Sequence, residues 1–140
     1  MSDSADGLRL HVAPDRTALE PTRLAVLDFL APHALSAAAV YAVELVLEEV
    51  LSNQIKYAYT GRTAEPLGLS VAVAADRIEL LFEDRGVAFD PLRAEPPPGA
   101  RSIEDARVGG LGLGLVRQFT DSAHYERRDG ANRLAVAILR

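Results

Sequence analysis

EEVLSNQIKYAY (residues 48–59) is the stretch that decides how the rest of this chain is interpreted. Its apolar residues recur at intervals of three and four, a spacing that predicts a helix packed against a core. Glu49 and Asn53 lie four positions apart, so this helix projects both side chains from one face. A carboxylate can take a proton from a hydroxyl group, and a carboxamide oxygen is a suitable ligand for Mg²⁺. Because such pairs are also common on solvated helix faces, the other motifs of the chain must decide between a polar surface and a ligand site.

The size and composition of the chain restrict its class. A length of 140 residues predicts a single domain that spans residues 1–140. The formal net charge of -5 argues against direct binding to nucleic acid or to an anionic membrane. There is no cysteine, which excludes disulfides and thiol catalysis. No apolar run has the length of a membrane span or of a signal peptide, so we expect a cytoplasmic protein.

Hydrophobic periodicity and turn residues predict a two-layer α+β sandwich. We expect strands at residues 8–12, 67–73, 77–83, 122–127 and 133–139, and helices at residues 15–31, 36–59 and 111–120. Most strands come as hairpins, so the sheet should be mixed and mainly antiparallel, with the helices on one face. Residues 92–108 hold three consecutive prolines and no sustained period, and a loop of this length is usually either functional or disordered.

Two further motifs have features of a nucleotide site. Asp84 ends an apolar strand and could accept a hydrogen bond from an exocyclic amine such as that of adenine, while Gly86 would let a planar ring approach the backbone. Residues 109–114 (GGLGLG) open a helix, whose free backbone amides form a site for phosphate. Taken alone, each motif is also explained by an ordinary turn or a flexible hinge.

The common lysine-dependent nucleotide sites are excluded. Lys56 is the only lysine in the chain, and it does not follow a glycine-rich turn as a Walker A lysine does. The strand lysine and HRD loop of a eukaryotic-type protein kinase are also missing. A nucleotide must therefore be bound by the acid, amide and glycine motifs described above.

Taken together, the three motifs resemble those of the Bergerat (GHKL) ATP-binding fold. The chain is most similar to anti-sigma serine-protein kinases of the RsbW, SpoIIAB and BtrW type. EVLSNQIKYAY (residues 49–59) resembles their N box, DRGVAFDP (residues 84–91) their first glycine box, and GGLGLGLV (residues 109–116) their second. The similarity runs from about residue 8 to the end of the chain and is weakest in the first helix.

The resemblance implies a role for each motif in a single histidine-kinase-like ATPase domain. Glu49 would be the general base and Asn53 would hold Mg²⁺, whereas Asp84, with Gly86 beside the ring, would bind adenine. Residues 91–109 would form a lid over ATP. The phosphates would be wrapped by Gly110, Leu111, Gly112, Leu113 and Gly114.

Two positions depart from the pattern of the family. Many members carry His where this chain has Tyr57, and Thr near the position of Ala135, where it reaches adenine through water. The second departure bears on nucleotide affinity. Neither departure removes a group that phosphoryl transfer needs.

The resemblance implies an anti-sigma factor and serine/threonine kinase that uses Mg-ATP to phosphorylate a STAS-domain anti-sigma-factor antagonist. A sigma factor would be its other partner, and the kinase would be a homodimer. The alternative is a partner-switch module that binds nucleotide and sequesters a sigma factor or STAS protein without phosphotransfer. Glu49 argues against this alternative, because a pure binding module has no use for a base. The ATP-binding domain of a histidine kinase ranks third, because such domains usually carry Asn at this position, and a topoisomerase-type ATPase ranks lower still.

Overall fold

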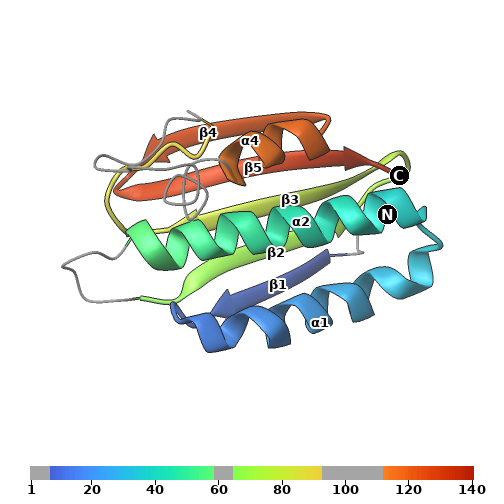
Figure 1. Ribbon diagram of the computed structural model, residues 1–140, viewed down its shortest axis with the longest axis horizontal. Helices are drawn as coiled ribbons and strands as arrows, with labels where there is room; N and C mark the ends of the chain where they lie inside the picture. Colours follow the sequence, from blue (N-terminus) through green and yellow to red (C-terminus); the bar gives the residue numbers. More distant parts are fainter. Residues whose placement is uncertain (1–6, 59–64, 93–111) are drawn as a thin grey trace.

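The computed structural model describes residues 7–58, 65–92 and 112–140, which form a sheet covered by helices on one face (Figure 1). The sheet has the strand order β1-β2-β3-β5-β4. Its strands are β1 (Gly7–Val12), β2 (Leu67–Val73), β3 (Arg77–Asp84), β4 (Ser122–Arg128) and β5 (Ala131–Leu139). The helices are α1 (Leu19–Leu30), α2 (Ala37–Asn53) and α4 (Gly112–Phe119). The predicted two-layer α+β sandwich is confirmed.

The described sheet is antiparallel throughout, where a mixed sheet was predicted. All four pairings, β1 with β2, β2 with β3, β3 with β5, and β5 with β4, are antiparallel. After β3 the chain crosses over through α4, so β4 runs in the same direction as β3. A hairpin turn joins β4 to β5, and β5 lies between β3 and β4 in the sheet. The two parallel strands, β3 and β4, are therefore not neighbours. The register aligns Asp84 at the end of β3 with Asn132 at the start of β5.

The core lies between the sheet and α2. Alternate residues of the central strands face it, as the period of two requires: Leu67, Leu69, Val71, Ile78, Leu80, Phe82, Leu134, Val136 and Ile138 are all at most 3% exposed. From α2 the side chains of Val43, Val46, Leu47, Val50 and Leu51 meet them, again at most 3% exposed. Burial of one such side chain contributes about 1.5–3 kcal/mol, so this layer fixes α2 against the sheet.

The helices differ from their predicted bounds at the ends. The predicted first helix is divided into a 3₁₀ turn (Arg16–Ala18), α1 and a second 3₁₀ turn (Ala31–His33), because Pro32 cannot continue the helix and Ala34 adopts a left-handed conformation with φ of 53°. The second helix is α-helical only to Asn53 and continues as a π-helical turn, η3 (Gln54–Ala58). The π turn begins directly after Asn53, so the change in helix type falls within the candidate site.

Several predicted features lie outside the described residues. Of the proposed lid at residues 91–109, only residues 91 and 92 are described, and Gly110 and Leu111 of the glycine motif are also outside. Gly112, Leu113 and Gly114 form the first turn of α4. Within the described ranges no helix is long and apolar enough to cross a membrane.

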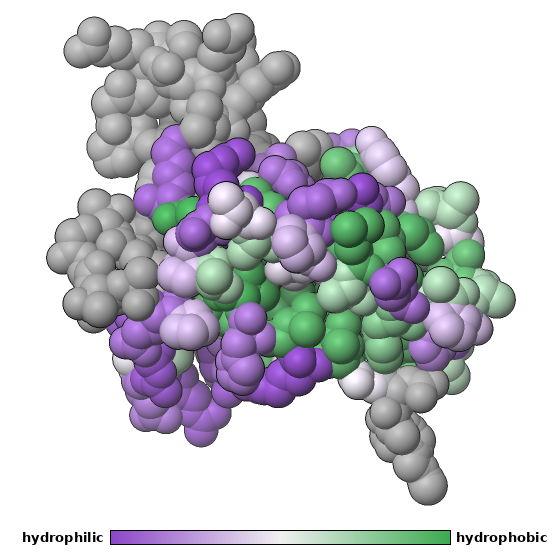
Figure 2. Space-filling model, turned by 90° about the horizontal axis from the view of Figure 1, so that it is seen from below, coloured by the Kyte–Doolittle hydropathy of each residue, from purple (hydrophilic) through white to green (hydrophobic). Residues whose placement is uncertain are grey.

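The side of the molecule that carries α1 and β1 presents a mixed surface. Hydrophobic residues extend from the centre to the right of this view, and hydrophilic residues gather mainly at its left and top (Figure 2). Among the large apolar side chains, Leu24 of α1 is 48% exposed. Single exposed apolar residues of this kind are normal on a small domain and do not by themselves mark a binding surface.

Candidate functional site

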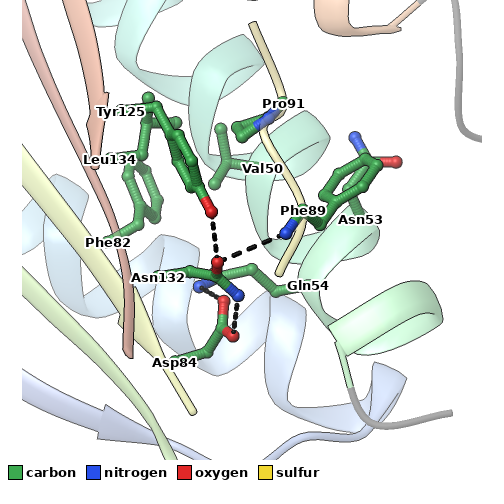
Figure 3. A pocket seen from close by; sticks show the side chains of 10 residues that line it. All are labelled: Val50, Asn53, Gln54, Phe82, Asp84, Phe89, Pro91, Tyr125, Asn132 and Leu134. Carbon is green, nitrogen blue, oxygen red and sulfur yellow. Dashed lines mark hydrogen bonds between the residues drawn. The ribbon is translucent and has the colours of Figure 1, made fainter. Parts of the chain in front are cut away.

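A small cavity lies where the last turn of α2, the end of β3 and the start of β5 meet (Figure 3). Its volume of about 20 Å³ is enough for one water molecule. It is lined by Val50, Asn53, Gln54, Phe82, Asp84, Phe89, Pro91, Tyr125, Asn132 and Leu134. Two of the residues singled out in the sequence, Asn53 and Asp84, are thus brought to one place.

The Asp84 carboxylate accepts three hydrogen bonds at the cavity. Its side chain is held at the end of β3, and the residue is only 7% exposed. Its Oδ2 accepts from Gln54 Nε2 at 3.0 Å, and its Oδ1 accepts from Asn132 Nδ2 at 2.8 Å and from the Gly86 amide at 2.9 Å. A carboxylate has about four acceptor positions, so these three donors leave one for a ligand.

Asn132 fixes Asp84 from the neighbouring strand. Its Nδ2 donates to Asp84 and also to the Val87 carbonyl at 2.8 Å. Its Oδ1 accepts from the Tyr125 hydroxyl at 2.5 Å and from the Phe89 amide at 3.3 Å (Figure 3). All four hydrogen-bonding positions of this amide are used, so Asn132 is a rigid support of the site.

Asn53 is fixed by its own helix. It is 3% exposed, and its Nδ2 donates to the Glu49 carbonyl one turn earlier at 2.7 Å. Because the nitrogen is used in this way, the orientation of the amide is set and Oδ1 is the atom left to accept. Among the described residues no group of three carboxylate or histidine side chains could hold a metal. The one amide oxygen of Asn53 could serve as a protein ligand for Mg²⁺, which keeps several waters and uses few protein ligands when phosphates supply the rest.

Glu49 is half-buried and has a raised pKa, but it is not among the residues that line the cavity. Partial burial, and then the negative charge of Glu48, raise the pKa of its carboxyl group. A raised pKa makes a carboxylate a stronger base. Glu48 itself is exposed and accepts from the Ser52 hydroxyl at 3.2 Å, so the two glutamates have different environments.

The loop after Asp84 is held in place at Gly86. This residue is buried, its amide donates to Asp84, and its carbonyl accepts from Arg127 of β4 at 2.7 Å. Both backbone groups of Gly86 are therefore fixed at the cavity. Ala135, a position where the family pattern places Thr, is exposed on the other face of β5, and its neighbour Leu134 lines the cavity instead.

The sequence analysis did not identify Gln54, Asn132 and Tyr125, which line the cavity. A signal for two of them was present. Gln54 falls in phase with Leu47, Val50 and Leu51 on the buried stripe of α2, and Asn132 falls in phase with Leu134 on the buried face of β5. A polar residue at a core position is unfavourable unless it is hydrogen-bonded, so both positions indicate a built polar network.

Similarity to known proteins covers most of the chain. Residues 12–138 match the family described as histidine kinase-like ATPase domain. The serine/threonine-protein kinase BtrW of Bordetella bronchiseptica is 37% identical over 96 residues, which cover 69% of this chain and 68% of that protein. The serine-protein kinase RsbW of Halalkalibacterium halodurans is 31% identical over 93 residues, which cover 63% of this chain and 56% of that protein.

Solved structures share the fold. The RsbU and RsbW domains of a Mycobacterium tuberculosis protein match 95% of this chain and 32% of their own, with a TM-score of 0.68 and 13% identity. The SiaB-SiaC complex from Pseudomonas aeruginosa contains a chain that matches with a TM-score of 0.68 and 17% identity, over 95% of this chain and 88% of that one.

Proposed function

Because this chain belongs to the histidine kinase-like ATPase domain family, we propose that it is an anti-sigma factor and a serine/threonine-protein kinase of the cytoplasm. It uses Mg-ATP to phosphorylate a STAS-domain anti-sigma-factor antagonist. The homology with BtrW and RsbW kinases supports this activity. We also propose that the kinase is a homodimer whose second partner is a sigma factor.

One observation carries the proposal. Asn53 and Asp84, which come from segments 31 positions apart, line the same cavity, and Glu49 lies on the Asn53 face of α2. A buried carboxylate that still has an acceptor position suits the exocyclic amine of adenine. A fixed amide oxygen one helical turn from a carboxylate of raised pKa suits a metal-bound phosphate beside a base.

In the proposed reaction the serine or threonine hydroxyl oxygen of the antagonist attacks the γ-phosphorus of ATP. The bond between that phosphorus and the β–γ bridging oxygen breaks, and ADP leaves. The hydroxyl proton passes to the Glu49 carboxylate. Asp84 and Gly86 hold the adenine, and the amides at the start of α4, with the preceding glycines, hold the phosphates. When bound through Asn53, Mg²⁺ would neutralise charge on the phosphates, which is the main requirement of this chemistry.

A phosphotransfer assay tests the proposal. The purified chain is mixed with Mg-ATP and the STAS-domain protein encoded nearest to it, and the intact mass and phosphosite of that protein are measured. We expect one phosphate on serine or threonine, with a rate about 10²–10⁴-fold lower in Glu49→Gln, because a general base contributes this much. Glu48→Gln is the matched control, since this neighbour is exposed and bonded to Ser52.

The outcomes separate the two functions. A rate unchanged in Glu49→Gln would remove that residue from the mechanism. A stable complex with the STAS protein and no phosphate would favour a partner-switch module without phosphotransfer. Analytical ultracentrifugation of the chain alone and with the sigma factor tests the proposed homodimer and the second partner.

A further inference from the structure

Gln54 carries the one buried side-chain nitrogen or oxygen without a hydrogen-bond partner among the described residues. The residue is 8% exposed, and its Oε1 has no partner. A buried acceptor without a partner is unfavourable, because it has lost its hydrogen bonds to water. The contrast with Asn132 is informative, because that second buried amide in the same cavity has every position filled.

The orientation of the Gln54 amide is determined by its partner. Its neighbour in the cavity is a carboxylate oxygen of Asp84, 3.0 Å from Nε2, and an ionised carboxylate only accepts. The nitrogen must therefore face Asp84. A flipped amide would set two acceptor oxygens against each other. Oε1 is thus held as a second acceptor beside Asp84, in the same cavity wall.

We propose that Gln54 is a specificity-determining residue for the nucleotide base: its Oε1 accepts one hydrogen of the exocyclic amine of adenine, and Asp84 accepts the other. The inference rests on the proposed function, because it takes ATP as the ligand. This role explains why Gln54 is polar. Its position continues the buried stripe of Leu47, Val50 and Leu51, where the pattern of α2 would place an apolar residue.

The spacing of the two acceptors suits a primary amine. An amine with two hydrogen bonds holds its acceptors roughly 5 Å apart, from the usual lengths and angles. Amide bond lengths and the hydrogen bond to Asp84 put Oε1 roughly 4–5 Å from the carboxylate oxygen. The cavity has room for only one water molecule, so a purine ring would enter only if lining residues such as Phe89 and Pro91 moved.

Selectivity follows from two adjacent acceptors. A 6-oxo purine, as in GTP or ITP, would place a carbonyl acceptor where the amine donates, opposite two buried acceptors, which is strongly unfavourable. An aromatic ring without any 6-substituent would lose both contacts without adding repulsion. Gln54 and Asp84 would therefore select for the amine itself and not only for the purine ring.

Proton NMR of ATP labelled with ¹⁵N at the 6-amino group tests this directly in the wild-type chain. If both amino hydrogens are bonded to protein, two separate downfield amino signals appear in the complex. In Gln54→Met one of them moves back to the position of a solvent-exposed amine. A wild-type complex with only one downfield amino signal would overturn the proposal, whatever the behaviour of the variant.

Affinities for ATP and for purine riboside triphosphate, which lacks the amine, give a second readout. With about tenfold for each hydrogen bond, we expect the analogue to bind wild type roughly 100-fold more weakly and Gln54→Met roughly 10-fold more weakly. If Gln54 only positioned Asp84, the ratio would also fall, because the contact of Asp84 with the amine would weaken. The wild-type spectrum separates the two roles, since positioning alone gives a single downfield amino signal. Ile55→Met is the matched control, because it places the same side chain at a neighbouring position outside the cavity, and its ratio should match wild type.

The failures of the two proposals can be told apart. If the chain binds ATP but transfers no phosphate, the proposed kinase activity fails while the amine signals still decide the role of Gln54. If transfer occurs and the affinity ratio is equal in wild type and Gln54→Met, only the role of Gln54 fails. If ATP does not bind at all, both are overturned.

Discussion

At the residue scale, the site consists of polar side chains at positions where the folding pattern requires apolar ones. Asp84, Asn132 and Gln54 all point into the core side of their elements, and all are at most 8% exposed. Hydrogen bonds among them offset most of the cost of burying them. The exception is the free Oε1 of Gln54, and exceptions of this kind are expected where a protein binds a ligand.

Glu49→Gln should change the pH dependence of stability. Burial raises the pKa of Glu49 in the folded protein, so ionisation of this group opposes folding. Below the unfolded pKa both states are protonated and wild type loses nothing. As the pH rises through the folded pKa, wild type becomes less stable relative to the variant, and the difference persists at neutral pH.

Urea denaturation of Glu49→Gln and wild type at pH 4 and pH 7.5 measures this effect. The variant should gain stability relative to wild type only at the higher pH. Glu48→Gln is a partial control: it removes the charge that is the second cause of the shift, so it should give a smaller gain of the same sign. A variant less stable than wild type at pH 7.5 would show that the Glu49 carboxylate has a stabilising partner.

At the element scale, α2 carries both the proposed base and the proposed metal ligand, so the bounds of this helix matter. It begins at a serine cap, where Ser36 Oγ accepts from the Ala39 amide at 3.1 Å. It ends at Asn53, and the π turn that follows carries Gln54. Such π turns are often found at functional sites. Here Asn53, the last residue of α2, and Gln54, the first residue of the π turn, both line one cavity.

Ser36→Ala should destabilise the protein by about 1 kcal/mol, because the cap satisfies a backbone amide that is otherwise left free. The measurement is chemical denaturation with the slope held common to both proteins. Ser122→Ala, at an exposed strand start, is the control and should stay within about 0.5 kcal/mol of wild type. A loss for Ser36→Ala no larger than for this control would mean that the cap bond contributes nothing.

At the scale of the whole molecule, the site exists only because β3 pairs with β5 in the sheet. This pairing aligns Asp84 with Asn132, and the layer of α2 above it adds Asn53 and Gln54. A ligand in this cavity contacts elements from three parts of the chain. Ligand binding should therefore stabilise the domain as one unit.

Mg-ATP should raise the melting temperature of the full chain. At a concentration about 100 times its dissociation constant, a ligand adds about 2.7 kcal/mol, which corresponds to a shift of roughly 5–15 °C for a domain of this size. Differential scanning calorimetry measures it. Addition of EDTA should reduce the shift, and Mg-GTP at the same concentration should give a much smaller one. Equal shifts with the two nucleotides would contradict base recognition by Asp84 and Gln54.

The sequence by itself determined the order of elements, the α+β class and the three motifs. These follow from local signals: the periods of 3.6 and 2, turn residues such as Asp129 and Gly130, and the spacing of Glu49 and Asn53. In the structure Asp129 and Gly130 join β4 to β5 with positive φ values of 53° and 78°, as a two-residue hairpin turn requires. Local periodicity could not show the strand order, because pairing of β3 with β5 depends on contacts between distant parts of the chain.

Only the tertiary structure decided which polar residues share the cavity. Asn132 is 48 positions from Asp84 and Gln54 is 30 positions from it, so no spacing in the sequence links them. Their hydrogen bonds arise from strand register and from the packing of α2 on the sheet. The π turn was also not predicted, because the spacing of apolar residues indicates a helix without distinguishing its type. The sequence thus shows which polar residues fall at positions that face the core, and long-range packing determines what each of them contacts.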